Sequence, residues 1–248
     1  MKNFSIVIST VAIVMAAVSL VATFKKPCSK AEKPEASVVL TQADLSKMLN
    51  ENPEIVANAL QAYQVKQQEE AERAANEALA KYADQINSSE NAPFVGKEDA
   101  KVIMVEFFDF SCGYCKRLAP ALEKSIDKNS DVKFIFKPLT FLGDMSLYKA
   151  KAALAANKQG KFFEFYNKAM TGNQQDEAAV DAMAKEIGLN IDTYKKDMES
   201  EDVKKALNEI SDLAQNIRVN GVPTLLVNGK KIHAYDAEAI QKVLDEAK

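Results

Sequence analysis

Short apolar runs and longer segments of helical spacing alternate along the second half of the chain. Residues 102–108 and 132–136 are apolar runs rich in β-branched and aromatic residues, which predicts two buried strands. The pattern between them predicts a helix from about residue 111 to residue 129. A strand, a helix and a strand in this order favour a parallel crossover.

A second group of elements lies near the C-terminus. Residues 222–227 and 231–233 predict two short strands joined by Asn228-Gly229, which is a strong hairpin signal. Asp236 is placed to cap a last helix that ends near residue 247. The two groups together predict an α/β domain.

Residues 144–218 separate these two groups and have helical spacing throughout. Gly160, Gly172 and Gly188 are the points at which we expect the helical pattern to break. The sequence therefore predicts a helical insertion between the two halves of the α/β domain.

Residues 41–90 precede that domain and predict a helical arm. Thr41 and Asp44 form a capping-box pattern, and residues 52–54 provide a second helix start with a proline in its first turn. The helical pattern then continues to about Ile86 without a glycine or a further proline. We expect one long helix over this stretch.

Two narrow apolar stripes follow the arm, and they need a partner, because a long helix with so little apolar surface is marginal alone. Self-association through residues 41–86 is the interpretation we prefer. Folding back on the second domain, or a mostly solvated arm, are the alternatives. Residues 87–93 interrupt the helix, so residues 91–248 form the second domain. The stripes comprise Leu45, Leu49, Val56, Leu60 and Tyr63, and then Ala75, Leu79, Tyr82 and Ile86.

The N-terminus carries an uncharged apolar run at residues 4–24. This run reaches the roughly 20 residues that span a bilayer, so residues 1–24 are either a cleaved signal peptide or a membrane anchor. Residues 25–40, with two prolines and many charges, read as a tether. Either interpretation places the rest of the chain in the periplasm or another extracytoplasmic space.

Cys28 lies in this tether. Lipidation of Cys28 is disfavoured, because no small residue precedes it. A disulfide between subunits, removal with the leader, and an unimportant thiol all stay open.

Composition narrows the function. The 248 residues are 47% hydrophobic and carry a net charge of −3, which weighs against a nucleic-acid partner. Three cysteines are too few for a disulfide scaffold, and two of them lie close together. Close cysteines indicate redox chemistry or metal binding.

Cys112-Gly113-Tyr114-Cys115 follows a predicted strand and opens a predicted helix. A helix N-terminus stabilises a thiolate and lowers its pKa, and the thiolate is the species that attacks a disulfide. We expect Cys112 to be the exposed attacking thiol and Cys115 the buried resolving thiol. Gly113 and Tyr114 lie between them and are expected to tune the redox poise.

A metal site is the competing interpretation of this motif. A structural zinc site wants four ligands, yet the chain has one histidine, His233, far along the sequence, and no second C-x-x-C. We therefore predict no metal. Cu(I) binding that protects both thiols would favour a copper-handling protein, and full activity of Cys112→Ala would favour a protein that acts through its arm.

Residues 106–115 resemble the active-site strand and helix of DsbA-like periplasmic oxidoreductases, and residues 112–120 are also similar to the thioredoxin active-site helix. Residues 92–102 resemble the lead-in of DsbA-like domains, and Gly221-Val222-Pro223-Thr224 resembles their cis-proline loop. The resemblance covers residues 91–248. It implies a thioredoxin fold with an inserted helical domain at residues 144–218, preceded here by the helical arm.

The resemblance also implies site roles. Pro223, if cis, lies against the cysteine pair and shapes a substrate groove with Val222, Gly113 and Tyr114. Glu106 matches an acid buried beneath the active site that relays the proton of the resolving cysteine. No cofactor is implied, because the electrons reside on the sulfurs.

Two departures leave the direction of the reaction open. The Gly-Tyr dipeptide replaces the Pro-His of simple DsbA, and the arm is like that of the oligomeric ScsC and DsbC relatives. Val222 favours an oxidase served by a membrane partner of the DsbB kind, whereas the arm favours an isomerase or reductase served by a DsbD-like protein. In both cases the expected clients are reduced or misfolded secreted proteins, and we lean to the oxidase.

Overall fold

The computed structural model describes residues 41–248. The expectations for residues 1–24, for the tether at 25–40 and for Cys28 lie outside the described residues. The chain divides into two units, one ending at Val56 and the other spanning Ala57–Lys248, and each is described by itself.

The described part of the first unit holds α1 (Gln42–Glu51) and the first turn of α2 (Pro53–Lys81). The predicted capping box is confirmed. The amide of Asp44 donates to the hydroxyl of Thr41 at 3.2 Å, and the amide of Thr41 donates to the carboxylate of Asp44 at 3.1 Å. No residue of α1 is buried.

The second unit is built on a five-stranded sheet with the strand order β1-β3-β2-β4-β5. The strands β2 and β3 are parallel, as the predicted crossover requires, and the other pairings are antiparallel. The edge strand β1 was not predicted, because three residues are too short for a periodic signal. The strands are β1 (Phe94–Gly96), β2 (Val102–Phe108), β3 (Val132–Pro138), β4 (Thr224–Val227) and β5 (Lys230–Ile232).

Side chains alternate across the central strands and create two cores. Met104 and Phe108 of β2 face the larger core, which α4 (Gly113–Lys128), α10 (Ala237–Ala247) and the insertion cover. Val105 and Phe107 face the smaller core, which contains residues of α3 (Ala83–Asn87) and α9 (Glu201–Asn216). Both faces of β2 are therefore buried.

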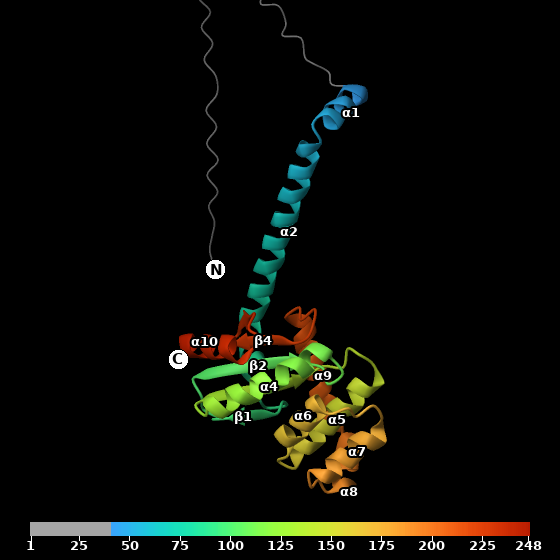
Figure 1. The fold of residues 1–248 in the computed structure, drawn as a ribbon, viewed down its shortest axis with the longest axis vertical. Helices are drawn as coiled ribbons and strands as arrows, with labels where there is room; N and C mark the ends of the chain where they lie inside the picture. Colours follow the sequence, from blue (N-terminus) through green and yellow to red (C-terminus); the bar gives the residue numbers. More distant parts are fainter. Residues whose placement is uncertain (1–40) are drawn as a thin grey trace, which may run out of the picture. The chain divides into compact units, whose positions relative to one another are not determined.

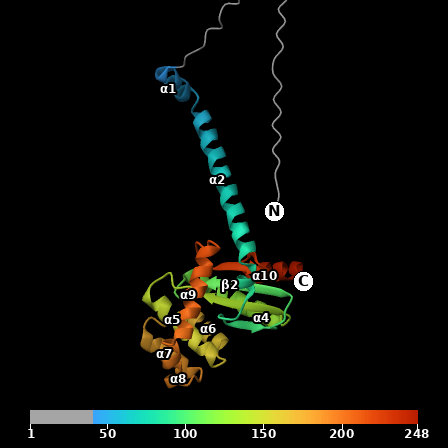
Figure 2. The ribbon, with the colours of Figure 1, turned by 180° about the vertical axis from the view of Figure 1, so that it is seen from behind.

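The insertion forms five helices, and α5 to α8 gather beside one end of the sheet (Figures 1 and 2). Breaks near Gly160, Gly172 and Gly188 are confirmed, and one more break at Ser200 was not predicted. That break has a polar cause, since the hydroxyl of Ser200 accepts from the amide of Val203 and starts α9. The helices are α5 (Asp144–Lys158), α6 (Phe162–Thr171), α7 (Glu177–Glu186), α8 (Ile191–Met198) and α9 (Glu201–Asn216).

The long helix predicted to reach Ile86 is wrong at its end. The helix α2 stops at Lys81, and a turn at Tyr82 leads into α3. Leu79 and Ile86 are buried in the smaller core, so the second apolar stripe packs on the sheet domain. The alternative of folding back therefore holds for this end of the arm.

The predicted hairpin is confirmed at Asn228-Gly229, whose φ angles of 47° and 76° match the left-handed turn that such a pair favours. Asn228 also extends the sheet beyond β4. Its amide donates to the carbonyl of Ile103, and its side-chain Oδ1 accepts from the amide of Ile103, both at 2.8 Å.

Across residues 41–248, the helices are too short or too polar to serve as candidate membrane spans.

Candidate active site

Cys112 caps the N-terminus of α4, directly after the loop that leaves β2. Its φ and ψ of −76° and 120° are those of an N-cap residue. The expectation of an exposed thiol is wrong, because Cys112 is only 7% exposed. The cause is the facing loop at residues 221–223, since the Sγ of Cys112 lies 3.5 Å from the carbonyl oxygen of Val222.

Cys115 lies one turn further along α4 and is fully buried, as predicted. Burial raises the pKa of its thiol, and the negative charge of Glu106 raises it further, while a backbone hydrogen bond from Asp109 acts in the opposite direction. Cys115 therefore holds its proton strongly.

The Val222–Pro223 peptide bond is cis, as the resemblance implies. The loop is closed by the hydroxyl of Thr224, which donates to the carbonyl of Gly221 at 2.8 Å. A proline has no N–H, so no donor at position 223 competes for the sulfurs. Among the described residues, the Cys112 thiol is the one hydrogen-bond donor to the carbonyl oxygen of Val222.

Glu106 lies on β2 beneath the cysteines and is 2% exposed. The hydroxyl of Tyr166 on α6 donates to its Oε2 at 2.9 Å, and its Oε1 has no hydrogen-bond partner among the described residues. Burial raises the pKa of Glu106 to about 8, against the lowering effect of the Tyr166 hydroxyl. The carboxyl group is therefore largely protonated at neutral pH.

Tyr166 was missed by sequence reasoning. It lies in a box of aromatic rings whose edges and faces pack around the end of β2. In the sequence it occupies one apolar position of a helix, 60 residues after Glu106. No local pattern indicates that its hydroxyl binds a carboxylate on a strand. The other rings of the box are Phe108, Phe110, Phe136, Phe162, Phe163 and Phe165.

Asp109 was also missed, although it lies within the motif. Its side chain is fully buried at the end of β2. Its Oδ1 accepts from the amide of Ser111 and from the hydroxyl of Ser146, both at 2.7 Å, and its Oδ2 accepts from the amide of Leu142 at 3.1 Å. The signal that could have found it is a carboxylate in an otherwise apolar stretch.

Exposed apolar side chains lie on the segments around these groups. Tyr114 is 69% exposed, and the guanidinium of Arg117 lies 4.3 Å from the centre of its ring. Phe141, Leu142 and Leu147, beside and within the first turn of α5, are also exposed.

The structure thus brings together the predicted site residues Cys112, Cys115, Glu106, Val222 and Pro223, and Gly113 and Tyr114 lie between the two cysteines at the start of α4. His233 lies apart, exposed after β5. Among residues 41–248, no three His, Cys, Asp or Glu side chains are grouped as a metal site.

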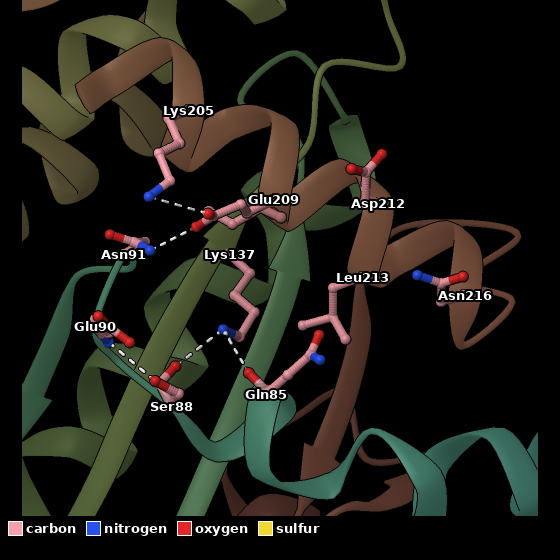
Figure 3. A pocket seen from close by; sticks show the side chains of 11 residues that line it. Gln85, Ser88, Glu90, Asn91, Lys137, Lys205, Glu209, Asp212, Leu213 and Asn216 are labelled. Atoms are coloured by element: carbon pink, nitrogen blue, oxygen red, sulfur yellow. Dashed lines mark hydrogen bonds and ion pairs between the residues drawn. The ribbon is translucent and has the colours of Figure 1, made fainter. Parts of the chain in front are cut away.

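A separate cavity of about 420 Å³ opens on the face of the smaller core, between the end of α3 and α9 (Figure 3). Lys137 of β3 lies at its base and is 4% exposed. Its Nζ donates to the carbonyl oxygens of Ser88 at 3.0 Å and Gln85 at 3.3 Å. Burial lowers the pKa of Lys137 to about 8.

Comparisons with known proteins agree with this geometry. The profile of the family described as Thioredoxin matches residues 88–246. The probable disulfide bond formation protein D of Bacillus cereus is 31% identical over 166 residues, which cover 61% of this chain and 76% of that protein.

Two solved structures are similar over more of the chain. The thiol-disulfide exchange protein alpha-DsbA2 of Wolbachia pipientis is 27% identical with a TM-score of 0.65, and the match covers 70% of this chain and 96% of that one. Proteus mirabilis ScsC in a transitional conformation is 28% identical with a TM-score of 0.62, over 83% and 94% of the two chains.

Proposed function

Because the chain belongs to the thioredoxin family, in its DsbA-like group, and is a thiol:disulfide oxidoreductase, we propose that it acts outside the cytoplasm as an oxidase of secreted proteins. The observation that carries the proposal is the placement of Cys112. It caps α4 with its sulfur against the loop of cis Pro223, and Cys115 is buried one turn away. Cys112 and Cys115 form the redox pair.

The reaction starts from a disulfide between Cys112 and Cys115. A thiolate of the reduced client attacks the Sγ of Cys112, the bond between the two cysteines breaks, and Cys115 leaves as a thiolate. The second client thiolate then attacks the client sulfur of the mixed disulfide, and Cys112 leaves. The client gains one disulfide, and the two electrons stay on the cysteine pair.

The buried residues serve the leaving group. The pKa of Cys115 is raised, so its thiolate takes a proton as it leaves, and the protonated carboxyl of Glu106 is the group placed beneath it to supply one. The cis Pro223 loop, with Val222, Gly113 and Tyr114, forms the surface on which the client chain lies. The pair is reoxidised by a membrane partner of the DsbB kind.

The test uses residues 25–248 with Cys28→Ser, so that Cys112 and Cys115 are the remaining cysteines, in the disulfide form and mixed with reduced and unfolded ribonuclease. We expect client thiols to disappear in proportion to the oxidised protein added. Cys112→Ser should abolish the reaction, and Cys115→Ser, carrying only one thiol, should accumulate as a mixed disulfide with the client. Oxidation by Cys112→Ser at the rate of the parent chain would refute the assignment.

A second function, disulfide isomerisation by an oligomer, is favoured by the exposed first stripe of the arm. Leu60 and Tyr63 of α2 are 55% and 60% exposed, and Val56 is also exposed. Such a row of apolar side chains on one helix is suited to pairing with other copies of the chain. Leu60→Glu with Tyr63→Glu should then yield monomers that no longer reshuffle scrambled ribonuclease.

The matched control for this test is Gln61→Glu, which adds a charge beside the stripe at an exposed position. It should leave both the sedimentation coefficient and the reshuffling rate unchanged. A parent chain that sediments as a monomer contradicts the isomerase proposal and leaves the oxidase as the function.

A further inference from the structure

The carboxylate of Asp109 joins three segments of the sheet domain. It accepts hydrogen bonds from Ser111 in the loop after β2, from Leu142 in the loop after β3, and from Ser146 in the first turn of α5. A fully buried carboxylate with three donors is well satisfied, and hydrogen bonds to a charged acceptor are among the stronger ones. Asp109 therefore fixes these segments relative to one another.

The backbone of the same residue fixes the nucleophile. The amide of Cys112 donates to the carbonyl oxygen of Asp109 at 3.0 Å. Asp109 thus links the main chain of Leu142 to that of Cys112. Its carboxylate accepts from the amide of Leu142, and its carbonyl oxygen accepts from the amide of Cys112. Leu139 adds a further link, since its amide donates to the carbonyl of Phe108 at 2.7 Å.

The segment held in this way carries exposed apolar side chains. Phe141 and Leu142 are 49% and 54% exposed, although the amide of Leu142 is bonded to a buried group. A loop that presents apolar side chains to solvent while its backbone is tied to the reactive cysteine is suited to contacting a bound chain.

A buried cation, Lys149, lies near the carboxylate and also near a second cation. Lys149 of α5 is 3% exposed, and its charge interacts with both Asp109 and Lys116 of α4. Burial is the main reason that the pKa of Lys149 is lowered, the charge of Lys116 lowers it further, and the charge of Asp109 acts against both.

We propose that Asp109 is a positioning residue that holds Phe141 and Leu142 in fixed register with Cys112, and that this register gives the enzyme its preference for polypeptide thiols over small thiols. The inference rests on the proposed oxidase function. A polypeptide thiol reaches Cys112 with chain on both sides of it and gains from a correctly placed apolar neighbour. A small dithiol needs only the sulfur.

Asp109→Asn tests the inference because the amide keeps one acceptor and replaces the other with an NH₂ group. The acceptor can serve either Ser111 and Ser146 or Leu142, and in both orientations one backbone N–H faces the new NH₂. The link between the two loops is therefore lost while size is kept. Asp144→Asn is the matched control, with the same change at an exposed position on the same segment.

The disulfide form of each variant is reduced by dithiothreitol and, separately, by a peptide with two cysteines, and the second-order rate constants are compared. We expect Asp109→Asn to lower the rate constant with the peptide about tenfold, because the bound peptide is slightly misplaced relative to Cys112. The rate constant with dithiothreitol should stay within about twofold of the parent value. Asp144→Asn should change neither. Equal losses with both reductants, or none, would overturn the inference.

A second variant covers the case in which Asp109→Asn does not fold, as judged by its thermal melt. Phe141→Ala with Leu142→Ala removes exposed side chains only and should show the same selective loss with the peptide. If the loss is not selective, the register has no role. If the parent chain is reduced by neither reagent, the proposed function itself fails, which is a different outcome.

Discussion

Glu106 and Lys137 occupy neighbouring strands of one sheet but face opposite cores, and they show two ways of burying an ionisable group. Both titrate near pH 8, the carboxyl raised and the ammonium lowered to about that value by burial. Lys137 has two main-chain carbonyl partners and borders a cavity. Glu106 has one partner, and its second oxygen has none among the described residues.

The difference separates a structural group from a reactive one. Lys137 ties β3 to the end of α3, and its donors are used for that purpose. Glu106 is left incompletely bonded beside two cysteines, where gaining or losing a proton costs little rearrangement. Substitutions that remove one group at a time test whether the two groups differ in this way.

The largest expected effect is on stability as a function of pH. Between pH 4.5 and about 8 the folded chain keeps the Glu106 proton that the unfolded chain releases, so the free energy of unfolding falls as pH rises. Between about 8 and 10.5 the unfolded chain keeps the Lys137 proton that the folded chain releases, so the free energy of unfolding rises. These two groups give a minimum near pH 8, with an acidic limb of roughly 5 kcal/mol and an alkaline limb of roughly 3 kcal/mol.

Urea denaturation of the disulfide form, in which Cys115 has no proton to titrate, measures both limbs over this pH range. Glu106→Gln should flatten the acidic limb alone, and Lys137→Met should flatten the alkaline limb alone. If either variant changed the limb assigned to the other, the two groups would not titrate independently, and the comparison would fail.

The next effect is on the rate of exchange. Glu106→Gln removes the proton that serves Cys115, so client oxidation at pH 7 should slow roughly tenfold, at the low end of general acid–base effects. Lys137→Met, the matched removal of a buried charge on the other face, should stay within about twofold of the parent rate, because no reacting atom is near it. Rates measured by the loss of client thiols decide this, and equal slowing by both variants would mean that stability rather than proton transfer limits the reaction.

The smallest effect comes from Tyr166→Phe. The hydroxyl lowers the pKa of Glu106, so its loss should raise that pKa above 8 and shift the pH profile of exchange upward, by a change on the order of 1 kcal/mol for one hydrogen bond. The profile from pH 6 to pH 10 measures it. An unmoved profile would indicate that another group sets the titration.

Much of the fold followed from local patterns, and the errors have physical causes. The crossover, the hairpin and the breaks of the insertion each have a sequence signal of a few residues. The break of the arm at Tyr82 has none, because the buried positions Leu79 and Ile86 keep helical spacing across it, and only packing on the sheet forces the turn.

The site divides in the same way. Cys112, Cys115 and Glu106 are marked by their spacing, whereas the burial of Cys112 depends on a loop more than a hundred residues later. Asp109 and Lys137 are polar residues at strand ends, where exposure is the ordinary expectation. Asp109 binds Leu142 and Ser146, and Lys137 binds Ser88, all from other segments of the chain. No local pattern predicts such contacts.

The turn at Asn228-Gly229 also bears on the chemical ageing of the protein. An asparagine before a glycine is prone to deamidation, in which the glycine nitrogen attacks the carboxamide, ammonia leaves and a cyclic imide forms. Here the carboxamide oxygen is held by the amide of Ile103, so the reaction competes with the ladder between β2 and β4. Opening of the imide to isoaspartate adds a methylene to the backbone of the turn. The change in the turn therefore affects β2, the strand that leads to the cysteines.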